Sequence, residues 1–295
     1  MTSTTARDWI TIGELARRSG LSPDLLRAWE RRYGLLRPRR TASNRRLYSR
    51  ADEARIRLMQ RFLGDGMPAA RAAEMVCAAP LSVTAGEGPR VAEHEVHAAH
   101  AEMREALDGF HESPAQRVLA RLLAAHSRLA VIRDVIIPYL HDVGERWAAD
   151  HLTVAQEHFA STFLQVRLHA MARGWDRGTG PQALLACAAG ERHVFGLLSF
   201  GIALHAFGWR ITYLGADTPA GMVDAAAESV RPDLIVLSAV SPARFAGERP
   251  SLERLAVRWS CAIAGAGASA ELAADLGARH LARDPVTSAR DVYGT

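Results

Sequence analysis

Apolar positions near the start of the chain follow the spacing of short helices. They recur every three or four positions over residues 11–20, where Gly20 ends the predicted helix. Ser22 and Pro23 have the residue types of an N-cap and a first helical position, and the apolar stripe behind them predicts a second helix that ends at Gly34. Two short helices joined by a tight turn indicate a helix-turn-helix.

An irregular stretch and two further helices complete the predicted N-terminal domain. Residues 35–49 mix Pro, Ser and Asn with arginines, a pattern that suits a short β wing rather than a helix. Helical spacing of apolar residues returns over residues 50–64 and 67–79. We therefore expect residues 1–79 to fold as a winged helix-turn-helix domain.

The middle of the chain contains helical patterns only. Residues 80–90 are rich in Pro, Gly, Ser and Thr and predict a linker. No strand-like alternation follows, and amphipathic stretches predict a four-helix bundle over residues 91–178. The four stretches are residues 91–110, 114–126, 128–149 and 153–173.

The hydrophobic period changes after the bundle. Short apolar runs alternate with helical stretches, which predicts a doubly wound parallel sheet of flavodoxin-like or Rossmann-like type over residues 181–295. The chain is therefore predicted to be a multidomain protein of the α and α/β classes. In doubly wound sheets, ligands bind outside the carboxyl ends of the strands. The predicted strands cover residues 183–189, 209–214, 234–240 and 261–264, with 279–283 as a candidate fifth, and the predicted helices cover residues 194–207, 219–230, 249–258 and 268–277.

Charge is unevenly distributed along the chain. Residues 1–80 contain 16 arginines and 8 acidic residues, a balance of +8, whereas the remainder contains 20 arginines and 24 acidic residues, a balance of −4. A basic N-terminal segment joined to a mildly acidic remainder is typical of a DNA-binding module attached to a sensor. The charge therefore favours a nucleic-acid partner for the first predicted domain.

Composition argues against several other classes of protein. No run of about 18 apolar residues appears and the first residues are polar, so we expect a cytoplasmic protein without a membrane segment. The three cysteines form no CxxC pair, which argues against a disulfide framework and a thiolate zinc site. His94, His97 and His100 recur at three-residue spacing without a carboxylate or cysteine cluster, and we interpret them as a polar helix face.

The predicted wing and the helix before it concentrate the positive charge. Nine arginines and a single acidic residue, Glu30, lie between Arg27 and Arg50, both included. The segments ITIGELARRSGLS, LRAWERRYGLLRP and RRTASNRRLYS make residues 10–78 resemble the MerR family of winged-helix regulators. This resemblance implies double-stranded promoter DNA as a partner. It also implies DNA contacts by Arg27, Arg31, Arg32, Tyr33, Arg39, Arg40, Asn44, Arg45, Arg46 and Tyr48.

Many members of the MerR family dimerise through a long helix that follows this domain. Here the linker begins at about residue 80, and no sustained heptad repeat follows it. We therefore expect self-association into dimers or tetramers through the C-terminal half of the chain.

A histidine loop follows the first predicted strand. In the segment GERHVFG, His193 lies just past the carboxyl end of that strand, where doubly wound sheets bind their ligands. The segment resembles the loop of cobalamin-binding domains of the methionine synthase and methylmalonyl-CoA mutase type, with Glu191 for the usual Asp and, further along the chain, Val240 for the usual Leu. The resemblance implies that His193 is the lower axial ligand of cobalt and that Glu191 orients its ring. The cofactor-binding residues implied in this domain are Glu191, Arg192, His193, Gly196, Ser238, Val240, Gly265 and Gly267.

The last two predicted bundle helices carry a third signal. Trp147 is followed by Glu157 and His158, and Thr153 and Gln156 form a capping box at the head of the helix that carries this pair. With the order of the three domains, these residues resemble the CarH and LitR type of light-sensing regulators. The resemblance implies adenosylcobalamin as the cofactor, with Trp147, Glu157 and His158 against its upper face. It also implies a repressor, not an enzyme, that binds promoter DNA as an oligomer in the dark and releases it in the light.

One position departs from this resemblance. Relatives have a histidine directly after the tryptophan, which captures cobalt in the light, whereas this chain has Ala148. His151 and His158 are candidates for that ligand, although neither has the matching position.

Two other functions are open from the sequence. A MerR-type regulator could sense cobalamin or another tetrapyrrole without photochemistry, and the sequence hardly separates this alternative from a photoreceptor. A cobalamin-dependent methyltransferase component is disfavoured, because such enzymes need a separate catalytic domain, often a barrel of about 250 residues. No unassigned stretch of that length is present.

Overall fold

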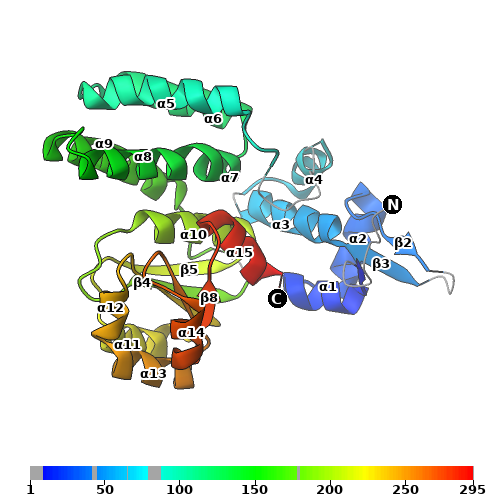
Figure 1. Ribbon diagram of the computed structural model, residues 1–295. Coiled ribbons are helices and arrows are strands. Elements are labelled where there is room, and N and C mark those ends of the chain that lie inside the picture. The colour runs from blue at the N-terminus through cyan, green and yellow to red at the C-terminus, as the bar shows by residue number, and fades with distance from the viewer. Residues whose placement is uncertain (1–8, 42–44, 65, 79–87, 178–179, 295) are drawn as a thin grey trace. The chain divides into compact units, whose positions relative to one another are not determined.

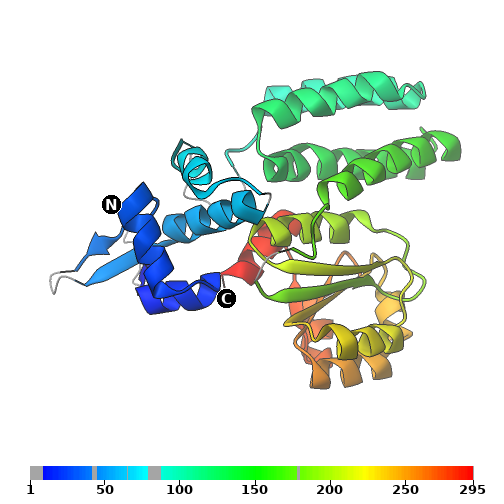
Figure 2. The same cartoon turned by 180° about the vertical axis from the view of Figure 1, so that it is seen from behind.

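The computed structural model describes residues 9–41, 45–64, 66–78, 88–177 and 180–294. These residues form two compact units (Figure 1, Figure 2). One unit contains the described residues up to position 78 together with Arg177 and Gly180, and the other contains residues 88–176 and 181–294. The predicted bundle and the predicted sheet therefore belong to a single unit. None of the described helices combines the length and the apolar character that a membrane span needs.

The first unit is a winged helix-turn-helix, as its pattern predicts. The Ser22 hydroxyl accepts a hydrogen bond from the Leu25 amide at 3.2 Å, and Gly20 and Gly34 end the first two helices with φ angles of 67° and 61°. Glycine enters this left-handed region without strain, so both helices end where the sequence indicates. The helices are α1 (Ile12–Ser19), α2 (Pro23–Tyr33), α3 (Arg50–Gly64) and α4 (Ala69–Ala78).

A small antiparallel sheet forms the wing. Strand β3 (Arg46–Ser49) lies between β2 (Arg39–Arg40) and β1 (Trp9–Ile10). The β2–β3 hairpin falls inside the stretch predicted as a wing, whereas β1, which pairs Ile10 with Tyr48, was not predicted. A strand of two residues has too few positions for an alternating pattern to be recognised.

Four helical segments form the bundle of the second unit. Helix α5 (Glu93–Asp108) pairs with α6 (Glu112–Ala125), and α9 (Val154–Met171) packs on α5 and on α8 (Ile137–Ala148). The predicted capping box is present at the start of α9, where the backbone amides and side chains of Thr153 and Gln156 are joined at 3.0 and 3.2 Å.

A π-helical turn interrupts the third bundle helix. Pro138 follows Asp134 by four residues, so it has no amide to bond the Asp134 carbonyl, and its ring would clash with that carbonyl in an α-helix. A π turn widens the helix and removes the clash. The His100 ring bonds the Val135 carbonyl at 2.9 Å and so stabilises the turn. The segments are α7 (Arg128–Val131), η2 (Ile132–Ile136) and then α8.

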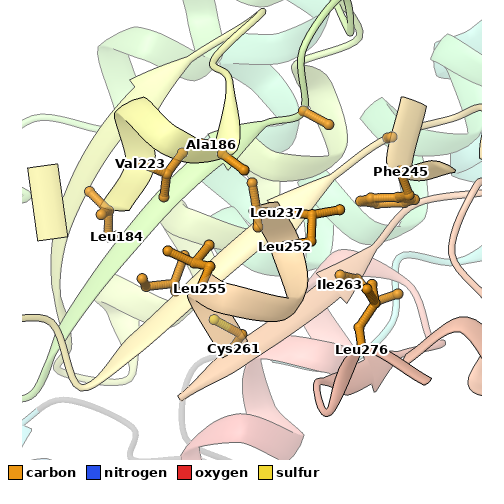
Figure 3. Packing of buried hydrophobic residues seen from close by; sticks show 14 of the residues in the cluster. Leu184, Ala186, Val223, Leu237, Phe245, Leu252, Leu255, Cys261, Ile263 and Leu276 are labelled. Carbon is orange, nitrogen blue, oxygen red and sulfur yellow. The ribbon is translucent and has the colours of Figure 1, made fainter. Parts of the chain in front are cut away.

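The sheet of the second unit has helices on both faces. Its five parallel strands have the order β5-β4-β6-β7-β8, which is the predicted doubly wound arrangement. Helix α10 covers one face, whereas α11, α13 and α14 cover the other (Figure 1). On the latter face, Leu184, Leu237 and Ile263 of three strands pack with Val223 and Leu255 (Figure 3). The strands are β4 (Gln182–Cys187), β5 (Arg210–Gly215), β6 (Leu234–Ser238), β7 (Cys261–Ala264) and β8 (Arg279–Leu281), and the helices are α10 (Phe195–Ala206), α11 (Ala220–Val230), α13 (Arg249–Arg258) and α14 (Ala270–Leu276).

Two helices of this unit were not predicted. They are the single-turn α12 (Pro242–Ala246) and α15 (Pro285–Tyr293), which follows β8. Helix α15 packs along α10, where Tyr293 stacks on Phe207 with ring centroids 5.5 Å apart, and it also contacts η2. Asp284 caps α15 through two backbone amides. The contacts of α15 with η2 and of α9 with α10 join the bundle to the sheet.

A buried aspartate joins the wing to the helix behind it. Asp52 is fully buried, and its carboxylate accepts hydrogen bonds from the Arg37 amide at 2.7 Å, the Ser49 amide at 2.9 Å and the Ser49 hydroxyl at 2.8 Å. Arg55 adds a charged partner at 3.1 Å. One carboxylate therefore fixes both ends of the segment that contains the hairpin.

Replacing Asp52 with Ala should lower the free energy of unfolding by roughly 3–5 kcal/mol, because Arg55 and the amides at both ends of the hairpin lose a buried charged partner. Urea unfolding of the full chain, followed by circular dichroism, measures this change. Asp24→Ala is the matched control, since Asp24 is an exposed aspartate of α2 whose loss should have little effect. Equal effects of the two substitutions would contradict this role for Asp52.

Candidate functional site

Exposed arginines line α2 in the first unit. Arg27, Arg31 and Arg32 are exposed to solvent. Arg27 bonds the Asp24 carboxylate at 3.1 Å, and the Arg32 guanidinium lies 5.4 Å from the centre of the half-buried Tyr33 ring. These side chains form a positively charged helix surface, which is suited to phosphate oxygens.

The β2–β3 hairpin carries a second set of exposed arginines. Arg39, Arg40 and Arg45 are exposed, and neither Arg39 nor Arg45 forms an ion pair with another described residue. The Arg45 amide donates to the Thr41 hydroxyl at 3.1 Å, which holds the end of the hairpin together. Asn44, a further predicted contact in this turn, lies outside the described residues.

Tyr48 departs from the expectation that it contacts DNA. Its side chain is fully buried, and its hydroxyl donates to the Glu30 carboxylate at 2.8 Å, which Arg46 also contacts at 3.2 Å. Burial and the bond to Glu30 raise the pKa of the Tyr48 phenol, so the hydroxyl remains a donor. A buried phenol cannot reach a phosphate directly. In this structure Tyr48 instead positions Glu30 and, through it, Arg46.

A buried carboxylate organises the loop after β4 in the second unit. Glu191 is only 2% exposed. Its Oε1 accepts hydrogen bonds from the His193 amide at 2.8 Å and from the His193 ring Nδ1 at 2.6 Å, and its Oε2 accepts one from the Val240 amide at 2.7 Å. The loops after β4 and β6 therefore meet at one side chain.

These hydrogen bonds decide the charge of Glu191 and the orientation of His193. Burial would raise the pKa of the Glu191 carboxyl, but the bonds from the His193 and Val240 amides and from the His193 ring outweigh it and hold the pKa below its usual range. A carboxylate beside Nδ1 favours the tautomer that carries its proton there. Nε2 of the ring, whose side chain is 70% exposed, is then available to a metal.

Other predicted cofactor residues lie around this loop. Arg192 is exposed beside His193, and Gly196 in the first turn of α10 faces open space. Ser238 ends β6, and its hydroxyl makes no hydrogen bond with another described residue. A hydroxyl without a partner in the described part of the chain and a glycine that faces open space fit a ligand that approaches this edge closely.

The two glycines after β7 have a structural reason of their own. A Cβ on Gly265, whose φ is 90°, would lie 2.4 Å from the Ala239 carbonyl oxygen, and one on Gly267 would lie 2.5 Å from the Ser241 carbonyl carbon. The Gly267 amide donates to the Ala239 carbonyl at 3.0 Å. The loops after β6 and β7 therefore pack backbone against backbone, and the neighbouring loop takes the space that these glycines provide.

Two acidic residues that the sequence reasoning missed hold the same loops. Asp217, in the loop after β5, accepts a hydrogen bond from the Gly190 amide at 2.6 Å. Glu248, just before α13, accepts hydrogen bonds from the Ala189 amide at 3.2 Å and the Ala220 amide at 2.9 Å. Because their partners are backbone amides distant in the sequence, no local pattern marks these acids.

The predicted cap residues lie near the turn between α8 and α9. Trp147 is 48% exposed near the end of α8, and Ala148 after it is also exposed. Glu157 accepts a hydrogen bond from the Ser161 hydroxyl at 2.6 Å, and the exposed His158 ring lies 3.6 Å from the Glu157 carboxylate. This turn lies at the end of the unit toward which the carboxyl ends of β4 and β6 point (Figure 1, Figure 2).

The side chains near His193 are suited to a metal ion that a cofactor already coordinates, rather than to a free metal ion. Among the residues that the structure describes, no group of three or more His, Cys, Asp or Glu side chains could enclose a metal ion. Burial and the Glu191 carboxylate raise the pKa of the Cys187 thiol to about 12, so this cysteine supplies no thiolate. A cobalt ion held by a corrin ring needs one axial donor from the protein, and the exposed His193 ring fits that requirement.

Comparisons with known proteins found family models that match two parts of the chain. Residues 10–78 match the model described as MerR HTH family regulatory protein, and residues 95–171 match the model described as B12 binding domain. The chain is 34% identical to the HTH-type transcriptional repressor CarH of Myxococcus xanthus over 83% of each chain, and 33% identical to the HTH-type transcriptional repressor CarA of the same organism over 92% of each. The chain belongs to this family of transcriptional repressors.

Family membership settles the coarser features of function. The chain is a MerR-type, DNA-binding transcription regulator with a B12-binding domain, and it is not an enzyme. The Methanosarcina barkeri monomethylamine corrinoid protein shares its fold, with a TM-score of 0.56 at 20% identity over 67% of this chain and 98% of that chain.

Glu191→Gln should lower the free energy of unfolding by about 1–3 kcal/mol at neutral pH, because a side-chain amide cannot accept all three hydrogen bonds of the carboxylate. The pKa of Glu191 is lowered in the folded chain, so its contribution is complete above the usual carboxyl pKa of 4.5 and is lost as the pH falls through the lower folded value. The difference between wild type and variant should therefore shrink below pH 4.5.

Urea unfolding across a pH series measures this difference. Glu253→Gln, on the exposed surface of α13, is the matched control. A difference that stays constant or grows as the pH falls would show that the charge of Glu191 does not supply the stability.

Proposed function

We propose that this protein is a light-responsive transcriptional repressor, which binds promoter DNA as an adenosylcobalamin-dependent oligomer in the dark and releases it after illumination. The observation that carries the proposal is the exposed Trp147 at the end of α8, with Glu157 and His158 on α9, at the same end of the unit as His193. An exposed indole at the end of the unit where ligands are expected to bind is suited to stack on a flat group such as adenine.

The chain's own residues would hold the cofactor from two sides. From the sheet, His193 would supply the lower axial nitrogen for cobalt, with Glu191 fixing its ring. From the bundle, Trp147, Glu157 and His158 would cover the upper face. Bound adenosylcobalamin supplies a cobalt–carbon bond that visible light breaks. The other residues proposed to line the lower face are Arg192, Gly196, Ser238, Val240, Gly265 and Gly267.

The cap is tied to the rest of the bundle by side chains next to Trp147. Arg146 bonds the Asp108 carboxylate at the end of α5, and Gln156 in the first turn of α9 donates to the Asp108 carbonyl at 2.9 Å. Both helices that carry the upper-face residues are therefore fastened to the same point of α5. A movement of Trp147 would be transmitted to α5 and so to the surface of the bundle.

Self-association would link the state of the cofactor to DNA affinity. Several N-terminal units in one oligomer bind DNA with a raised effective concentration, so loss of the oligomer alone weakens binding. The exposed arginines of α2 and the hairpin would supply phosphate contacts. The proposed DNA contacts are Arg27, Arg31, Arg32, Tyr33, Arg39, Arg40, Arg45 and Arg46.

A regulator that senses cobalamin or another tetrapyrrole without photochemistry is the second candidate. Ala148 favours it, because a methyl group cannot bind cobalt at the position where light-sensing relatives have a histidine. His151 and His158 are the next imidazoles along the chain.

Sizing of the adenosylcobalamin-loaded protein in darkness and after green light tests the proposal. We expect an oligomer in the dark that becomes smaller after illumination. Trp147→Ala should weaken the dark oligomer, because it removes the cover of the upper face, but should retain cobalamin binding through His193. A wild-type protein that keeps its dark size after complete photolysis, followed by absorbance, would contradict light control and favour the second candidate.

Ala148 gives the same experiment a second readout. Because no histidine directly follows Trp147, added imidazole should change the absorption spectrum of the illuminated wild type. Ala148→His should remove that sensitivity. If imidazole leaves the wild-type spectrum unchanged, another group such as His151 or His158 occupies the upper position.

Replacing Arg39 and Arg45 together with Ala should weaken binding to every DNA sequence and lower the slope of log Kd against log salt by roughly 1 per lost phosphate contact. Fluorescence anisotropy across a salt series measures both quantities. Arg254→Ala is the control, since Arg254 is an exposed arginine of α13 in the second unit. An unchanged slope would exclude the hairpin from the DNA interface.

A further inference from the structure

An arginine of α12 lies across the histidine loop. A Cβ added at Gly190 would lie 2.2 Å from Nη1 and 2.9 Å from Cζ of Arg244. The Arg244 guanidinium therefore covers the backbone of Gly190, an approach that the absence of a side chain at position 190 allows. Because α12 follows β6 and Gly190 lies in the loop after β4, Arg244 bridges the edge of the sheet at which His193 lies.

This guanidinium has no protein partner within the described chain. The Arg244 amide donates to the Ser241 carbonyl at 3.1 Å, but its exposed guanidinium forms no hydrogen bond or ion pair with another described residue. Three acids lie in the surrounding loops, but Glu191, Asp217 and Glu248 each hold backbone amides instead. A guanidinium that has no partner among the described residues and lies beside the His193 loop is suited to bind an anionic group of the ligand.

We propose that Arg244 binds the phosphodiester of the cobalamin nucleotide tail. Cobalamin carries its one phosphate in that tail, and a guanidinium binds phosphate through two parallel hydrogen bonds. Ser238, whose hydroxyl has no partner among the described residues, ends the strand that leads to Arg244 and offers the tail a second polar contact.

Arg244 would thus distinguish complete cobalamins from corrinoids that lack the tail phosphate. The inference rests on the cofactor part of the proposed function, which is cobalamin binding by the second unit, and is independent of photochemistry.

The test compares corrinoids that differ in the tail. Absorbance titrations of the full chain in the dark give Kd for hydroxocobalamin, cobinamide phosphate and cobinamide. Wild type should bind cobinamide phosphate about 10-fold to 100-fold more tightly than cobinamide. Arg244→Ala should bring this ratio close to 1 and weaken hydroxocobalamin binding, while leaving the Kd of cobinamide unchanged. Arg244→Lys should keep part of the ratio, since an ammonium retains the charge but not the fork.

Arg254→Ala, an exposed arginine of α13, is the matched control and should leave all three constants unchanged. An Arg244→Ala variant with an unchanged ratio would overturn the proposal. A variant that loses affinity equally for all three corrinoids would also overturn it, because Arg244 would then only position the loop. If wild type bound no corrinoid, this inference and the cofactor part of the proposed function would fail together. A protein that shows the phosphate ratio but does not respond to light would contradict light control alone.

Discussion

The carboxylate of Glu191 connects the loops after β4 and β6 in the second unit. The first of these loops carries the exposed His193 ring. A buried charge is costly unless hydrogen bonds compensate it. Here the amides of His193 and Val240 and the His193 ring supply three donors to one side chain. The ring nitrogen that faces solvent, its tautomer and the position of the β6 loop therefore all depend on the same group. Asp217 and Glu248 fasten the neighbouring loops in the same way.

Carboxylates also hold the arginine-rich hairpin of the first unit in place. Asp52 is buried beneath the hairpin and binds amides at both of its ends, while Glu30 holds the Tyr48 hydroxyl and Arg46. In each unit, an exposed side chain suited to phosphate or metal contacts a buried or half-buried carboxylate. These pairs are Arg46 with Glu30 and His193 with Glu191. Asp52 and Glu191 are buried, so these acids position the surface of each unit without being exposed on it.

Features set by neighbours in the sequence could be predicted, and features set by distant partners could not. The cap at Ser22 and the glycine that ends α2 depend on residues within one helical turn, so the pattern places them correctly. The burial of Tyr48 depends on pairing with β1, and the roles of Asp52 and Glu248 depend on amides 15 and 59 positions away. For the histidine loop, the family resemblance indicated Glu191 beside His193, but only the structure showed that Asp217 and Glu248 also hold the loop.

The π-helical turn η2 sets the direction in which the cap faces. A π turn inserts one extra residue into a helix, and each residue advances an α-helix by about 100°. Every side chain after η2, including Trp147, is therefore rotated by about 100° from the face on which an uninterrupted helix would present it. A helical wheel drawn over residues 128–149 misplaces the indole for this reason. Removal of one residue from the turn would rotate all of α8 about its axis. Trp147 would then point in another direction, although every amino acid of the cap itself would be unchanged.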